Sequence, residues 1–201
     1  MKQKKLLLSI LTMLLPVMAS ADSILKDGIY YSIISSGDNP EAEVAVIPEE
    51  WAANYNYSGH IVIPESFMFD YGDGMKEYKV TSIAENAFKD RDYLYSITIP
   101  ASVGSIGPKA FYGCSRLESV VSLREFPIVL STDVFSGLPA NATLYVAEGY
   151  KNAYRQTTGW SSFGENITEI DNSTLVAEKN WTGGFTGEYP FYLSCYGEVQ
   201  R

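Results

Sequence analysis

The chain has few residues of the kinds on which most catalytic and metal-binding sites depend. Its 201 residues include one histidine, His60, and two cysteines, Cys114 and Cys195. A zinc site needs several His or Cys ligands, and a nucleophile and its base must lie within roughly 3 Å of each other. Alternation along an extended strand points Ile61 and Ile63 inward and His60 outward, whereas Cys114 is expected inside. The sequence therefore predicts neither a metal site nor a His60–Cys114 pair.

Sequence motifs for nucleotide binding and serine hydrolysis are also absent. The chain contains no Gly-x-Gly-x-x-Gly, no Gly-x-x-x-x-Gly-Lys-Ser/Thr and no Gly-x-Ser-x-Gly. Two carboxylates can hydrolyse a glycosidic bond, but Asp90 and Asp92 alternate with Lys89 and Arg91, a composition that favours a solvated turn. We expect a protein without catalytic residues, metal ligands or cofactors.

Only one long apolar run occurs, and it stands at the beginning of the chain. Residues 6–17 follow three lysines and precede Ala19-Ser20-Ala21, the pattern of a secretory signal peptide over residues 1–21. The run is shorter than the roughly 20 residues that span a bilayer, so an uncleaved anchor is the weaker alternative. The prediction is an exported protein, secreted, periplasmic or attached to the cell surface, with no membrane span after cleavage.

Basic residues are outnumbered by acidic ones, 15 against 24. Removal of residues 1–21 takes away three lysines and no acids, which changes the net charge from −9 to −12. Such a charge repels phosphate backbones and anionic lipids, so nucleic acid is not an expected partner. The remaining 180 residues are enough for one domain with a substantial core.

What the sequence does contain is an internal repeat. The motif Val-x-Ser-Ile occurs at 80–83 and 103–106, an offset of 23. Phe88, Phe111 and Phe135 follow at offsets of 23 and 24, as do Ile97, Val120 and Leu144. Apolar residues at a period between 20 and 29 are typical of a leucine-rich solenoid.

Two hairpins are expected before the repeats. Residues 29–34 and 42–47 flank a cluster of turn formers, and residues 67–71 and 78–80 flank Gly72-Asp73-Gly74. The acids from Asp70 to Glu77 lack the ligand spacing of an EF-hand, so we interpret this segment as a turn and not as a calcium loop. Residues 60–64 are expected to form the first strand of the solenoid.

Beyond the last repeat strand the pattern becomes helical. Tyr150, Ala153 and Tyr154 share one face, Gly159 ends the helix, and two bulky aromatic residues follow. A helix there would cover the apolar end of a solenoid. Residues 171–201 contain Trp181 and other aromatics, and three alternatives stay open: they fold back, await a partner, or are a remnant of a longer protein.

The resulting fold prediction is an α/β but β-rich chain: a short right-handed leucine-rich repeat solenoid with an N-terminal β-hairpin cap and a C-terminal helical cap. The expected divisions are a signal peptide (1–21), an N-terminal cap with the first repeat strand (22–79), leucine-rich repeats (80–147), a helical cap (148–170) and a tail of unknown role (171–201). Cys114 precedes a repeat strand, where a small buried thiol packs well; a disulfide to Cys195 is the weaker alternative.

The repeats resemble a known family. Val80-Thr-Ser-Ile83 with Ala87-Phe88, Leu94-x-x-Ile-x-Ile-Pro100, and Ala110-Phe-Tyr-Gly-Cys-Ser-x-Leu117 are similar to the BspA-type leucine-rich repeats of exported and surface proteins of gut and oral bacteria. That resemblance implies adhesion or protein binding, with no catalytic residues to transfer. The third repeat departs from the pattern, because residues 121–127 lack the Ile-Pro step.

The sheet face of such a solenoid is the candidate binding site. Stacking the strands at the observed offset aligns four outward-facing pairs of residues: His60/Val62, Ser96/Thr98, Ser119/Val121 and Thr143/Tyr145. A strip of uncharged residues in so acidic a chain suits contact with a protein or a glycan ligand. Small residues also tolerate the curvature of a solenoid, which is an alternative reason for the strip. The alternative function is a structural or accessory cell-envelope protein without an external ligand.

Overall fold

The computed structural model describes residues 23–35, 38–44, 56–70, 72 and 74–171. The predicted signal peptide, Cys195 and the tail beyond Asp171 lie outside the described residues. None of the helices in the described ranges is both long enough and apolar enough to span a bilayer.

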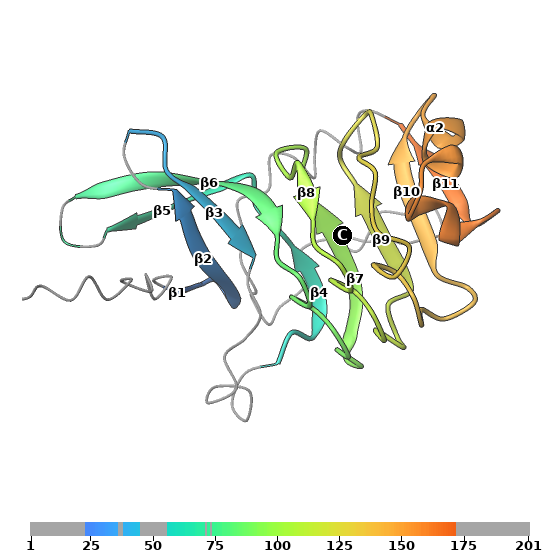
Figure 1. Ribbon diagram of the computed structural model, residues 1–201, viewed down its shortest axis with the longest axis horizontal. Helices are drawn as coiled ribbons and strands as arrows, with labels where there is room; N and C mark the ends of the chain where they lie inside the picture. Colours follow the sequence, from blue (N-terminus) through green and yellow to red (C-terminus); the bar gives the residue numbers. More distant parts are fainter. Residues whose placement is uncertain (1–22, 36–37, 45–55, 71, 73, 172–201) are drawn as a thin grey trace, which may run out of the picture.

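The described chain is β-rich, as predicted, with two sheets and few helices (Figure 1). One sheet has six strands, with five in the order β1-β2-β3-β6-β5 and β8 paired with β6. The bounds of these strands are β1 Ser23–Lys26, β2 Ile29–Ser35, β3 Glu41–Val44, β5 Ser66–Asp70, β6 Met75–Ile83 and β8 Ser105–Ile106. Strand β1 was not anticipated from the sequence.

The N-terminal part of the chain contains both expected antiparallel pairs. β2 pairs with β3, with Tyr31 opposite Val44. β5 pairs with β6, with Phe67 opposite Tyr78, and these two rings stack with centroids 5.6 Å apart. Both antiparallel pairings are therefore present, and residues 45–47 and 71 of the predicted strands lie outside the described residues.

The turn between β5 and β6 is held by the carboxylate of Asp70. Its Oδ1 accepts hydrogen bonds from the backbone N–H groups of Gly72 and Gly74, at 2.7 and 2.9 Å. A side-chain oxygen that bonds its own following backbone is the ordinary way in which Asp stabilises a turn. The geometry thus gives Asp70 a turn-forming role.

The second sheet is parallel and follows the repeat. Its order is β11-β10-β9-β7-β4, with the bounds β4 Gly59–Val62, β7 Leu94–Ile99, β9 Ser119–Ser122, β10 Thr143–Ala147 and β11 Ile167–Ile170. One buried residue from each strand stands in register across all five: Ile61, Ile97, Val120, Leu144 and Ile167. Each turn of the chain therefore adds one strand and one core residue to this row.

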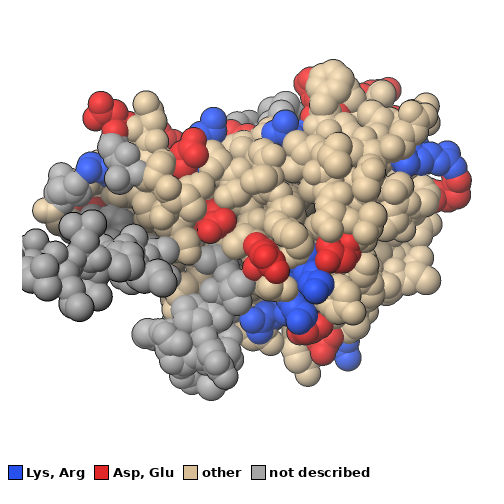
Figure 2. Space-filling model, in the orientation of Figure 1, with Lys and Arg blue, Asp and Glu red and all other residues tan. Residues whose placement is uncertain are grey.

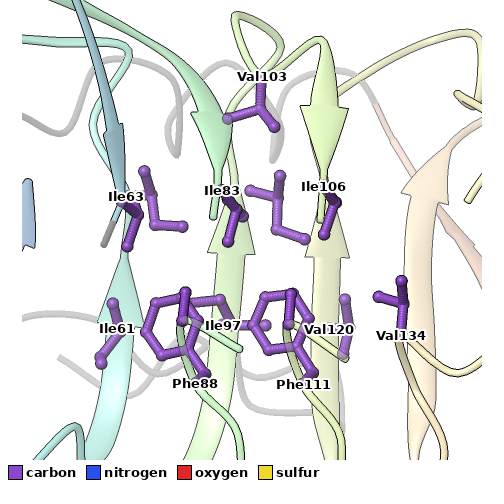
Figure 3. Packing of buried hydrophobic residues seen from close by; sticks show 14 of the residues in the cluster. Ile61, Ile63, Ile83, Phe88, Ile97, Val103, Ile106, Phe111, Val120 and Val134 are labelled. Atoms are coloured by element: carbon purple, nitrogen blue, oxygen red, sulfur yellow. The ribbon is translucent and has the colours of Figure 1, made fainter. Parts of the chain in front are cut away.

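The core lies between this sheet and the segments that return across it (Figure 3). Ile63, Ile83 and Ile106 form a second row beside the first (Figure 3), and all three are buried. Ile83 pairs with Ile106 where β6 meets β8, at the offset of 23 that the Val-x-Ser-Ile motifs predict. The repeat period is thus visible twice, once in each sheet.

A column of aromatic rings runs through the repeats. Phe88, Phe111 and Phe135 stack nearly parallel, with successive centroids 5.1 and 5.3 Å apart. The column continues at one end to Tyr57, 4.5 Å from Phe88. At the other end Phe135 meets Phe163 at 5.0 Å and Trp160 at 5.2 Å. The equivalence of the three phenylalanines, predicted from their spacing, is confirmed.

The segment 148–170, predicted as a helical cap, contains a strand as well as helices. It contains a short helix α2 (Lys151–Gln156) and a 3-10 helix η1 (Trp160–Phe163), and then strand β11, which pairs with β10. Ile167 lies 23 residues after Leu144, so the repeat period continues for one more strand. Only two apolar residues stand in β11, too few for the sequence pattern alone to predict a strand.

Strand β11 also supports the helix. The Oε1 atom of Glu169 accepts hydrogen bonds from the backbone N–H groups of Gly149 and Lys151, both at 3.0 Å. The first N–H groups of a helix have no partner within it, so this carboxylate satisfies one of them. The buried Tyr154 of α2 packs on Trp160 at 5.2 Å.

Candidate binding face

The strand register brings the eight candidate residues together in two rows. His60, Ser96, Ser119 and Thr143 stand side by side on β4, β7, β9 and β10. Val62, Thr98, Val121 and Tyr145 form the parallel second row. We call these eight residues the sheet face. None of them carries a carboxylate, an ammonium or a guanidinium group.

The sheet face is not evenly exposed. His60 is exposed, and Val62, Ser96, Ser119, Thr143 and Tyr145 are half-buried. Thr98 and Val121, however, are only 6% and 4% exposed. Alternation along a strand gives the direction of a side chain but not what covers it, so the expectation of an open strip needs correction at these two positions.

Val121 is buried because it belongs to a small apolar cluster on this side of the sheet. It lies with Leu123 and Ala147, and three partly buried side chains pack against them, those of Tyr145, Tyr150 and Ile170. Each strand from β9 onward adds an outward-pointing apolar residue to the cluster. The end of the sheet face near β11 is consequently apolar, and the end near β4 is polar.

The polar end is organised around His60. Its Nδ1 atom lies 2.7 Å from the hydroxyl oxygen of Ser96, within hydrogen-bonding distance. Partial burial lowers the pKa of His60 from its ordinary value of 6.5, which favours the neutral imidazole. A register shift between Gly59 and His60 gives β7 one extra residue, Tyr95, beside this pair.

Next to His60 lies a cluster that the sequence analysis did not single out. The guanidinium carbon of Arg116 lies 5.5 Å from the ring centroid of Tyr93, and its Nη1 donates a hydrogen bond to the hydroxyl oxygen of Tyr95 at 3.3 Å. The Tyr95 and His60 rings are 6.2 Å apart. We call these four residues the rim cluster. Tyr93 and Arg116 are separated by 23 residues, and that spacing is the signal that could have paired them.

Cys114, which was considered as a nucleophile, has a structural role. Cys114 is a free thiol in the core, as predicted; its Sγ donates to the Phe88 carbonyl oxygen at 2.9 Å. Burial raises the pKa of Cys114 to about 11, so the thiol is protonated at neutral pH. His60 is exposed and its partner is Ser96, whereas Cys114 is buried. The imidazole and the thiol that a catalytic dyad would need therefore lie in different environments.

One acid of the turn before β7 connects adjacent coils. Asp92 accepts a hydrogen bond from the Ser115 hydroxyl at 2.8 Å, again across an offset of 23, and Asp90 lies 3.8 Å from the ammonium of Lys89.

Figure 2 shows side chains of both charges gathered near the lower edge of the parallel sheet, whereas the area above them is mostly uncharged. Within the described ranges, no group of three or more His, Cys, Asp or Glu side chains is placed to hold a metal ion.

Comparison with known families identifies the repeats. The family model for the BspA-type leucine-rich repeat region matches residues 81–179 in six copies. The chain contains a BspA-type leucine-rich repeat region. The resemblance drawn from the sequence motifs is thereby confirmed. No curated protein sequence matches this leucine-rich repeat protein.

Three solved structures of bacterial proteins are similar to this chain. A leucine-rich repeat protein from Bacteroides capillosus is 23% identical, with a TM-score of 0.44 over 74% of this chain and 98% of its own. A leucine-rich cell surface protein from Faecalibacterium prausnitzii is 17% identical, with a TM-score of 0.37 over 74% of this chain. The pneumococcal vaccine antigen PcpA is 18% identical, with a TM-score of 0.35 over 65% of this chain. This repeat protein spans 30% and 42% of the length of the latter two.

Proposed function

We propose that this protein is an exported, non-enzymatic binding module that attaches to a protein or glycan ligand through its sheet face. In this proposal the repeats form a short right-handed solenoid. The hairpins of the N-terminal segment close one end, and the helical segment and β11 close the other. The predicted signal peptide directs the protein to the cell surface or beyond it.

The observation that carries the proposal is the alignment of the sheet face. Its eight residues come from four strands that are far apart in the sequence, and none is charged although the whole chain has a net charge of −9. Charged residues are depleted at the centre of protein interfaces, because their burial requires desolvation. An uncharged, hydroxyl-bearing area in an acidic protein is therefore suited to form the centre of a contact.

The two ends of the sheet face would contribute differently. Near β11, Tyr145 rests against the buried Val121, which is the arrangement of a rigid aromatic anchor on a packed base. Near β4, the hydroxyls of Ser96 and Ser119 and the imidazole of His60 supply hydrogen-bonding groups. Thr98 and Val121 are buried, so in this proposal they support the surface and do not touch the ligand.

The same burial favours the alternative function. A sheet face that is partly covered offers less area to a ligand, as expected for a structural or accessory protein of the cell envelope. Fractionation of cells distinguishes the two: retention in the envelope together with no ligand in a binding screen would support the structural role.

The test is a screen of the purified protein against arrays of host-surface proteins and glycans. We expect at least one saturable ligand. Ser119→Arg, which places a charge in the middle of the sheet face, should weaken its binding by at least tenfold. Tyr112→Arg is the matched control, because Tyr112 is exposed and lies in a turn and not in a strand of the sheet. Equal loss in both variants, or none in either, would contradict the assignment of the sheet face.

A further inference from the structure

The rim cluster combines an exposed cation with aromatic rings, and the repeat itself brings them together. Tyr93 and Arg116 occupy the same position in consecutive coils, just before the buried Leu94 and Leu117. Stacking the coils therefore places the guanidinium of Arg116 over the Tyr93 ring. Tyr93 is 54% exposed and Arg116 is exposed, so this arrangement is open to solvent.

The guanidinium of Arg116 has more hydrogen-bond donors than its one hydrogen bond to Tyr95 uses. A guanidinium carries five N–H donors in a planar fork, and the hydrogen bond to Tyr95 uses one of them. The ion pairs found among the described residues involve Lys26, Lys89 and Arg155, and not Arg116. The neighbouring acid, Asp92, accepts a hydrogen bond from Ser115. A fork of this kind matches a carboxylate in a bidentate contact.

The tyrosines add a second kind of contact. The face of an aromatic ring carries negative potential, and the C–H groups on one side of a pyranose ring are its natural partners. Arg116 contacts both Tyr93 and Tyr95. His60 lies beside Tyr95 and contacts Ser96. A single small area therefore contains a cation that can bind a carboxylate and aromatic rings that can contact the face of a sugar. It also contains hydroxyl and imidazole groups that can bond to sugar hydroxyls.

We propose that the rim cluster binds a carboxylate-bearing sugar at the end of a glycan, with Arg116 holding the carboxylate and the exposed part of the Tyr93 ring contacting the sugar ring. This inference rests on the proposed function and specifies the ligand. The net charge of −9 opposes a polyanion, since repulsion from the whole chain grows with each added negative charge. Distant charges are screened within about 10 Å, so a single carboxylate beside Arg116 is affected mainly by the guanidinium and by the nearby acid Asp92.

The test measures binding of 3′-sialyllactose and glucuronic acid to the full chain by saturation-transfer NMR and calorimetry, with lactose and glucose as their uncharged counterparts. We expect saturable binding of at least one acidic sugar, at least tenfold tighter than its uncharged counterpart. Arg116→Ala and Tyr93→Ala should each weaken it by at least tenfold. Arg116→Lys should recover only part of the loss, because an ammonium cannot form the bidentate contact.

Tyr112→Ala is the control, since Tyr112 is an exposed tyrosine of the same turn region without a ring or hydrogen-bond contact to the rim cluster among the described residues. It should change the affinity less than twofold. Equal binding of charged and uncharged sugars, no sugar binding, or binding that is unchanged by Arg116→Ala would overturn the inference. If the array ligand still binds in those cases, the proposed function stands; if the arrays also give no ligand, the proposed function fails with it.

Discussion

The phenyl rings of Phe88 and Phe111 lie face to face, with their centroids 5.1 Å apart and their planes inclined by 6°. Both side chains are fully buried. The backbone follows the same spacing, because the N–H of Phe88 donates to the carbonyl oxygen of Ala110 at 2.8 Å. Each coil thus presents to the next the same ring and the same hydrogen bond, and the stability of one coil depends on its neighbour.

Phe111→Ala should be among the most destabilising single changes in this protein. Phe111 contacts a ring on each side, so its removal leaves a cavity in the middle of the column. Truncation of a buried Phe costs about 3–5 kcal/mol, and we expect a loss in that range in denaturant unfolding. The adjacent Tyr112 is 39% exposed, and Tyr112→Ala should change stability by about 0.5 kcal/mol or less. Similar losses in the two variants would argue against the column as a structural element.

Substitution of Gly107 should destabilise the protein, whereas the same substitution of Gly104 should not. A Cβ on Gly107 would lie 2.4 Å from the backbone nitrogen of Glu85, whereas a Cβ on Gly104 would meet nothing closer than the Thr81 carbonyl oxygen, at 3.9 Å. Backbone cannot move aside as a flexible side chain can, and forced overpacking costs about 1–3 kcal/mol. Gly107→Ala should therefore lower the melting temperature clearly, and Gly104→Ala should leave it nearly unchanged. A thermal scan of both variants decides the point, and equal melting temperatures would contradict it.

The sequence predicted the parts of the fold that the repeat period controls. Phe88, Phe111 and Phe135 could be paired from spacing alone, because each stacks on its equivalent in the next coil. Strand β11 could not, since Ile167 and Ile170 are too few to form a pattern and the strand exists through its pairing with β10. The period of 23 from Leu144 was the one available signal.

The candidate site was predictable in register but not in exposure. The rows through Ser96 and Ser119 follow from the same offset. Thr98 and Val121 are buried, and the burial of Val121 depends on neighbouring side chains such as Tyr145 and Ile170. The contact of Arg116 with Tyr93 could have been predicted from their spacing. A ligand can reach this contact only because both side chains are exposed, and that exposure is known only from the structure.

Cys114 should be unreactive while the protein is folded. Its thiol is wholly buried, and burial raises its pKa to about 11. At pH 8 only about one thiol in a thousand would be ionised, and the thiolate is the reactive form. In a Cys195→Ser background, which leaves Cys114 as the only thiol, we expect no labelling by iodoacetamide at pH 8 until denaturant is added. Rapid labelling of the folded protein would contradict this assignment.

Protonation of His60 should destabilise the folded state. Its pKa is lowered from 6.5 by partial burial, so the unfolded chain binds the proton more readily than the folded one. Linkage then makes the free energy of unfolding fall as the pH drops through the unfolded value near 6.5 toward the lower folded value, and the contribution is fully present above that range.

This window lies above the range near pH 4 in which carboxylates ordinarily titrate. We expect unfolding in denaturant to require less denaturant at pH 6 than at pH 8. In His60→Gln, which keeps a hydrogen-bonding side chain beside Ser96 but does not titrate, the difference between the two pH values should be smaller. If the variant and the natural protein lost stability equally over this interval, His60 would not be the group that titrates.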